Sequence, residues 1–214
     1  GGPSFEDLLD SETRKTFRGL NSPARIQAFL DEMPYRPEDV YLSPLSAMRD
    51  GKAHCFDGGL LGALALRRLG HAPVIIDLIP WNDDDHVLAV YRIGKWYGAV
   101  AKSNYSGLRL REAVYRDPRE LVMSYFEQFF NTLGQKTLRG YTPPIRLGHY
   151  DRWNWETDDA GAWRVYQRML AAPKVTLFNE EQIGHWAPAD ERSIEAGLLG
   201  SRPEGLFRPE GGGT

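Results

Sequence analysis

Residues 55–70 read CFDGGLLGALALRRLG, and their apolar side chains surround the axis of the helix that the spacing predicts. Arg67 and Arg68 complement the negative end of the helix dipole, and Gly70 suits the position just past the last turn. A helix that is apolar on all sides has to be covered on all sides. We therefore expect this segment to be the central, buried helix of the fold.

Cys55 is the only cysteine, and it stands at the start of that helix. The backbone N–H groups and the dipole of a helix start favour the ionised form of a thiol. A lone cysteine is more often a small buried hydrophobic residue, but one at a helix start is less typical of that role. A single cysteine and five dispersed histidines predict no disulfide, no metal site and no cofactor.

Three strand-like segments follow the helix. Residues 74–79 read as a buried strand, 80–85 as a turn, 86–92 as a second strand and 96–100 as a third. They can form an antiparallel meander. We expect His86, at the head of the second strand, to lie at a sheet end that opens beside the helix. The order of helix, strands and further helices predicts an α+β architecture.

Other helices are marked by their caps. Ser22 and Pro23 begin a short amphipathic helix that Pro34 ends. Asp117 to Glu120 form a capping box, and the apolar spacing that follows predicts a helix as far as Leu133, closed by Gly134. A further helix is expected over residues 162–171.

A helix-borne thiol followed by a strand-borne imidazole is the arrangement used in nucleophilic cysteine catalysis. In that interpretation His86 takes the proton of Cys55 and later protonates the leaving group. A second interpretation remains open, in which His86 is a strand-edge histidine satisfied by the carboxylates of residues 83–85.

Residues 50–105 resemble the transglutaminase-like cysteine hydrolase superfamily, which includes papain-like relatives and the arylamine N-acetyltransferases. The resemblance rests on the Cys55 to Gly70 helix and on the spacing from His86 to Gly94 and Trp96. The stretches AHCFDG (53–58), DDHV (84–87) and AKSN (101–104) resemble a bacterial branch of these proteins. The resemblance implies a papain-like core in which the cysteine helix packs on an antiparallel sheet.

One position departs from the family pattern. The family usually places an aspartate on the third strand to orient the histidine, and Val100 stands there. Asn104 is the best substitute, since papain-like enzymes use an amide and since it shares the pleat parity of Val100 if the strand continues. An ordinary turn asparagine is the alternative. Ser103 and Lys102 are weaker candidates.

Other polar groups near these motifs allow two interpretations. The backbone N–H of Cys55 is the expected oxyanion donor. The aspartates at 83–85 lack the ligand spacing of a calcium loop, so a solvated turn is favoured over a cation site. Lys102, Arg109 and Arg111 could bind a substrate carboxylate, but an exposed basic loop is favoured.

The chain has 214 residues, of which 42% are hydrophobic, and its net charge is −3. We expect one domain over residues 5–200, with a core over about 20–135, a C-terminal extension over 136–200 and a disordered tail over 201–214. The charge predicts no nucleic-acid partner, and the absence of long apolar runs predicts no membrane partner and a cytoplasmic location.

These observations predict an enzyme, a cysteine-dependent hydrolase or acyltransferase acting on an amide bond through a thioester. Cys55 is the expected nucleophile, His86 the base and acid, and Asn104 the orienting group. The expected substrate is a peptide, a protein or a small amide. Two alternatives stay open: acyl transfer as in the arylamine N-acetyltransferases, and an inactive binding protein on the same scaffold.

Overall fold

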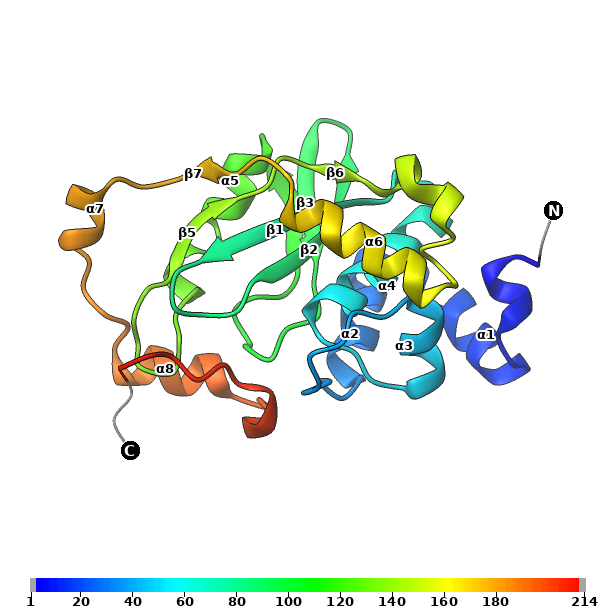
Figure 1. Cartoon of the computed structure of the whole chain (residues 1–214), viewed down its shortest axis with the longest axis horizontal. Coiled ribbons are helices and arrows are strands. Elements are labelled where there is room, and N and C mark those ends of the chain that lie inside the picture. Colours follow the sequence, from blue (N-terminus) through cyan, green and yellow to red (C-terminus); the bar gives the residue numbers. More distant parts are fainter. Residues whose placement is uncertain (1–2, 212–214) are drawn as a thin grey trace.

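A seven-stranded antiparallel sheet packs against a group of helices in the computed structural model, which describes residues 3–211 (Figure 1). The predicted α+β architecture is confirmed. The strands run in the order β4-β3-β2-β1-β5-β7, and β6 also pairs with β1. Their bounds are β1 Val74–Pro80, β2 His86–Ile93, β3 Trp96–Val100, β4 Arg111–Tyr115, β5 Leu138–Tyr141, β6 Ile145–Arg146 and β7 Val175–Thr176.

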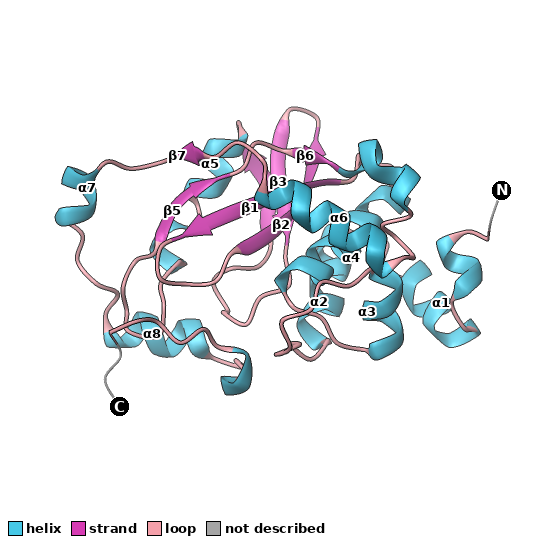
Figure 2. Ribbon diagram, in the orientation of Figure 1, coloured by secondary structure: helices cyan, strands magenta, loops and turns pink. Residues whose placement is uncertain are grey.

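Helices α1 to α4 and α6 gather on one side, and α7 and α8 lie at the far end of the sheet (Figure 2). The α-helices are α1 Ser11–Arg18, α2 Pro23–Glu32, α3 Pro44–Asp50, α4 Cys55–Arg68, α5 Pro118–Met123, α6 Asp159–Leu170, α7 Glu180–Gly184 and α8 Glu191–Leu198. Short 3-10 helices are η1 Phe5–Leu8, η2 Phe126–Gln128, η3 Leu147–Trp153 and η4 Pro203–Gly205. Within residues 3–211, no helix is long and apolar enough to cross a membrane.

The predicted meander is confirmed. Strand β2 pairs antiparallel with β1, so that His86 lies opposite Leu78, and β3 pairs with β2, so that Trp96 lies opposite Ile93. Alternate residues of β2 face opposite sides of the sheet. Val87 and Ala89 belong to the apolar cluster around α4, whereas Leu88 belongs to the cluster on the other face.

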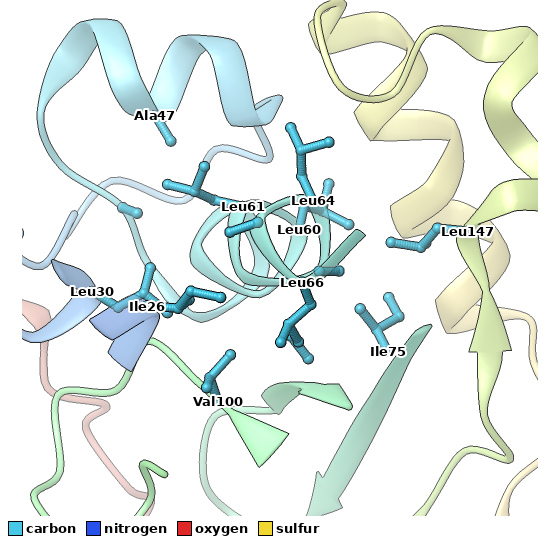
Figure 3. Packing of buried hydrophobic residues seen from close by; sticks show 14 of the residues in the cluster. Ile26, Leu30, Ala47, Leu60, Leu61, Leu64, Leu66, Ile75, Val100 and Leu147 are labelled. Carbon is cyan, nitrogen blue, oxygen red and sulfur yellow. The ribbon is translucent and has the colours of Figure 1, made fainter. Parts of the chain in front are cut away.

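Helix α4 is the central helix, as predicted. Figure 3 shows its leucines pointing outward on all sides, toward Leu30 of α2, Ala47 of α3, Val100 of β3 and Leu147. Its glycines let the sheet approach closely. A Cβ at Gly59 would lie 2.7 Å from Val87 Cγ1, and one at Gly62 would lie 3.2 Å from the Cβ of Ala89. This close packing sets the distance between the start of α4 and the start of β2.

The helix predicted from Pro118 to Leu133 is shorter than expected. Asp117 does cap α5, because its side chain accepts the N–H of Glu120 at 2.8 Å, but α5 ends at Met123. The guanidinium of Arg111 donates to the carbonyl of Ser124 at 3.1 Å and to its hydroxyl at 3.0 Å. A carbonyl held by an arginine is drawn away from the helix ladder, and the chain then continues as the 3-10 turn η2.

The last part of the chain returns toward the loops that follow β1 and β3. Helices α7 and α8 lead to residues 201–211, the segment for which the sequence predicts a disordered tail. Within this segment, the side-chain amides of Asn104 and Asn82 form hydrogen bonds with the main chain of Arg202 and Glu210. Residues 212–214 of the predicted tail lie outside the described residues.

Candidate active site

A buried polar network fixes the start of α4. His54 is the N-cap, and its Nδ1 lies 3.1 Å from the N–H nitrogen of Phe56 and 2.6 Å from Oδ1 of Asp57. The other carboxylate oxygen of Asp57, which is fully buried, accepts from Arg36 Nε at 3.2 Å. Nε2 of His54 pairs with the carbonyl of Val40. His54, which precedes Cys55, is therefore held by contacts with Phe56, Asp57 and Val40.

The thiol of Cys55 is half-buried and donates to the carbonyl of Asp85 at 3.3 Å. Burial raises the pKa of Cys55 well above its usual value, and the charges of Asp84, Asp77 and Asp85 raise it further. The sequence predicts the opposite direction from the helix start. The difference arises because desolvation and three carboxylates outweigh the N–H donors, so the resting thiol is neutral.

Alkylation measures this directly. We expect the reaction of Cys55 with iodoacetamide to rise with pH only above the pKa of about 8.5 of a free cysteine, because only the thiolate reacts. The same protein unfolded in urea is the control, and its profile should return to that of free cysteine. Rapid alkylation of the folded protein at pH 6 would contradict the neutral thiol.

His86 is the first residue of β2, and it is 4% exposed. Its Nε2 donates to the carbonyl of Leu108 at 2.7 Å. A carbonyl can only accept, so Nε2 carries the proton and Nδ1 keeps its lone pair. The ring meets Tyr125 and Phe129 edge-on. Burial lowers the pKa of His86 to about 4, so that the ring is a neutral base at pH 7.

The three predicted site residues line one small cavity of about 40 Å³. The cavity passes round the end of the sheet. It touches Phe129, which packs on the face away from α4, as well as Cys55, His86 and Asn104. The thiol and the imidazole each pair with a main-chain carbonyl in this resting arrangement. The structure thus brings Cys55 and His86 to one void.

Asn104 lies in the same cavity but is engaged elsewhere. Its Oδ1 accepts the N–H of Arg202 at 2.8 Å and its Nδ2 donates to the carbonyl of Arg202 at 2.9 Å. The orienting role predicted for Asn104 rested on a continued strand, but β3 ends at Val100, so the pleat parity does not extend to residue 104. The partner of His86 is the carbonyl of Leu108 instead, which no side-chain motif reveals.

Tyr35 lines the candidate site, although no sequence motif marks it. It lines the small cavity and also the groove outside Cys55. Burial, followed by the charges of Cys55 and Asp84, raises the pKa of Tyr35 well above its usual value. The group therefore remains a hydroxyl that can donate a hydrogen bond. Its position depends on a single bridge to Ala53, which local sequence patterns do not signal.

Asp77 is a second missed residue, although a charged residue inside the apolar run VIIDLIP is a visible signal. It is 2% exposed, and among the residues that the structure describes its Oδ1 has no hydrogen-bond partner. Burial raises the pKa of Asp77 to about 8, with a further contribution from the charge of Asp85. Asp77 is therefore mostly protonated at pH 7, which lessens the negative charge around the thiol.

Asp77 predicts a pH-dependent stability. Its folded pKa lies above the unfolded value, so its stabilising contribution is full below about pH 4 and is lost as the pH rises through about 8. Asp77→Asn cannot ionise. We measure the free energy of unfolding of both proteins in urea at pH 5 and at pH 9. The difference between Asp77→Asn and the native protein should shift in favour of the variant by at least about 1 kcal/mol from the lower to the higher pH.

The control for this comparison is Glu191→Gln, which removes an exposed carboxylate on α8. Its free energy of unfolding should change between pH 5 and pH 9 by the same amount as that of the native protein. An equal pH response of Asp77→Asn and the native protein would show that the buried carboxyl does not ionise in this range.

A groove of about 280 Å³ adjoins the thiol on its outer side. Its walls are acidic, and Tyr41 and His54 contribute rings. The carboxylates that line it are Glu38, Asp39, Asp84 and Asp85. A larger cavity of about 530 Å³ lies at the other end of α4, but its Arg67 is neutralised by Asp151 and Glu156, and among the described residues that line it there is neither a cysteine nor a histidine. The groove beside Cys55 is therefore the better candidate for a substrate.

The basic residues after β3 have structural partners. Lys102 is buried and donates to the carbonyl of Leu30 at 2.8 Å, so it caps the end of α2. Arg109 pairs with Asp31 at 2.8 Å, and Arg111 holds Ser124. These contacts argue against substrate binding, but the expected exposed basic loop is wrong, because Lys102 is buried and Arg109 and Arg111 are partly buried. Within the part of the chain that the structure describes, no group of three His, Cys, Asp or Glu side chains could hold a metal ion.

The chain matches no known protein-family description, and none of the curated proteins matches it. Among solved structures, it is similar to LapG of Legionella pneumophila, in an EGTA-treated form and in a second form. Each similarity has a TM-score of 0.36 and 14% sequence identity over 47% of this chain. It covers 70% of the EGTA-treated chain and 71% of the other.

Proposed function

We propose that the protein is a transglutaminase-like cysteine hydrolase that cleaves an amide bond in a peptide or protein through a thioester on Cys55. The observation that carries the proposal is the tautomer of His86. Its Nε2 proton is committed to Leu108, which leaves a basic Nδ1 on a ring that shares a cavity with the thiol. The family motifs at residues 53–58 and 84–87 support the same assignment.

The proposed reaction begins with a neutral pair. Nδ1 of His86 removes the Cys55 proton as Sγ attacks the amide carbon, so the S–C bond forms and the carbonyl π electrons move to oxygen. Collapse of this adduct breaks the C–N bond, and His86 returns its proton to the leaving amine. Water, deprotonated by His86, then attacks the thioester and releases the acid and the thiol.

The oxyanion requires donors at the start of α4. The backbone N–H of Cys55 lies at the positive end of the helix dipole. The hydroxyl of Tyr35 is the second donor in this proposal, because it is protonated and lines both spaces that meet at the thiol. Transfer of the acyl group to an amine instead of water would use the same intermediate, as in the arylamine N-acetyltransferases.

A binding protein on the same scaffold is the second candidate. The raised pKa of the thiol and the bond from Sγ to the Asp85 carbonyl favour it, because both hold Cys55 in an unreactive form. The two candidates differ in whether a covalent intermediate forms.

The experiment is a burst assay with p-nitrophenyl acetate, an activated acyl donor. The hydrolase should release p-nitrophenol stoichiometrically with protein and carry an acetyl group on Cys55 that neutral hydroxylamine removes. Cys55→Ala is the matched control and should show neither. Native protein that behaves like Cys55→Ala in both measurements would overturn the hydrolase and leave the binding protein.

A further inference from the structure

The C-terminal residues 202–210, here called the strap, are tied at both ends by asparagine side chains. Asn104 pairs with both the N–H and the carbonyl of Arg202, at 2.8 and 2.9 Å. Asn82 does the same for Glu210, accepting its N–H at 2.8 Å and donating to its carbonyl at 3.1 Å. Each amide therefore forms its hydrogen bonds to the strap with the main chain of one residue and not with the side chain of that residue.

The strap crosses the candidate site between these two ties. Gly205 lines both the small cavity and the outer groove, and Phe207 lines the small cavity with Cys55 and His86. Gly205 packs on the ring of Tyr35 so closely that an added Cβ would lie 2.7 Å from Cδ1. The strap thus covers the position at which a substrate would meet the thiol.

The strap is held weakly compared with the core. No residue from 202 to 210 is fully buried, and only Gly205, Leu206, Phe207 and Pro209 are partly buried, so the strap buries less apolar surface than a core element. Segments of this kind open at a low free-energy cost. Asn82, at the other tie, has φ 51°, a left-handed conformation that asparagine tolerates better than most residues.

Paired main-chain contacts of this kind suit an extended peptide of varied sequence, as in other modes of peptide recognition. We propose that Asn82 and Asn104 are the two main-chain recognition points of a peptide-binding groove over Cys55, and that the strap occupies this groove as an internal competitor. The peptide substrate takes the same path, with a glycine at the position of Gly205, because Tyr35 leaves no room for a side chain there. This inference rests on the proposed function for the chemistry that follows binding.

The strap repeats its own sequence around this point. The tetrapeptide RPEG occurs at residues 202–205 and again at 208–211, and the first copy supplies the glycine beside Tyr35. A synthetic peptide RPEGLFRPE, with the sequence of residues 202–210, is therefore the probe that matches the groove.

The test uses three variants of the full chain. Gly205→Val displaces the strap and leaves both asparagines intact. Asn82→Ala combined with Asn104→Ala releases the strap and removes the recognition points. Gly184→Val is the matched control, because no atom of residues 3–211 lies within 4 Å of a Cβ at that exposed position.

Two measurements that need no catalysis are expected to separate these variants. Alkylation of Cys55 by iodoacetamide at pH 8 should be about tenfold faster in Gly205→Val and in the double variant than in the control. Labelled RPEGLFRPE should bind saturably to Gly205→Val, should not bind to the double variant, and should lose binding when its single glycine is replaced by valine.

Either of two results would overturn the proposal: unchanged alkylation in Gly205→Val, or equal peptide binding by Gly205→Val and the double variant. The burst assay reports separately on the proposed function. Peptide binding by Gly205→Val without a burst in that same variant, whose strap no longer covers the thiol, would remove the hydrolase and keep the groove. A burst without peptide binding would keep the hydrolase and remove the groove.

Discussion

Replacement of His86 by alanine is expected to slow acetylation of Cys55 by p-nitrophenyl acetate by about 10²- to 10⁴-fold, the usual contribution of a positioned general base. The neutral thiol makes this loss large. With burial and three aspartates raising the pKa of Cys55, almost no thiolate exists at pH 7, so the reaction depends on a base that removes the proton during attack. His86 is the imidazole that lines the same cavity as the thiol.

The control is His149→Ala, which removes an exposed imidazole from η3. Its acetylation rate should equal that of the native protein. Circular dichroism and urea unfolding show whether His86→Ala retains the fold, since the change leaves a cavity beside Tyr125 and Phe129. A folded His86→Ala protein that reacts at the native rate would remove His86 from the mechanism.

The pH profile supplies a readout that a structural role would not change. Because the pKa of His86 lies near 4, the native rate should fall only as the pH drops through about 4, where the ring becomes protonated. This acid limb should be absent in His86→Ala. A limb near the ordinary histidine pKa of about 6.5 would instead indicate an imidazole open to water.

The central part of the fold could be predicted because its signals are local. The apolar helix at residues 55–68 and the three strands after it carry their periodicity within short windows, and their bounds agree closely with α4, β1, β2 and β3. Strands β5, β6 and β7 have only two to four residues each and exist through long-range pairing, as when Val175 lies opposite Tyr141. No local window contains that information.

The site could be predicted only in part, for a similar reason. The spacing of Cys55 and His86 suggested a pair, and the fold places both on one cavity. The electrostatics of the thiol depend on Asp77 of β1 and on Asp84 and Asp85 of the following turn, which meet only when the sheet forms. The carbonyl of Leu108 and the strap contacts of Asn104 are main-chain interactions, so residue types do not reveal them.

The close approach of α4 to its neighbours is what brings these parts together, and Gly58 is the residue that tests it. A Cβ at Gly58 would lie 2.2 Å from the Cβ of Lys102. Lys102 cannot move away easily, because its Nζ is tied to the carbonyls of Leu30, at 2.8 Å, and Met33. Lys102 therefore links the helix start, the end of α2 and the segment after β3.

Gly58→Ala is expected to destabilise the fold by about 2 kcal/mol in urea unfolding, the range typical of overpacking. A loss of stability would be informative, because alanine is favoured over glycine inside a helix by about 1 kcal/mol. Helix propensity alone therefore predicts that Gly58→Ala stabilises the fold. Gly184→Ala in α7, where a Cβ meets no atom of the described part of the chain within 4 Å, is the matched control and should be neutral or slightly stabilising. If both substitutions stabilise, the start of α4 does not pack closely against Lys102.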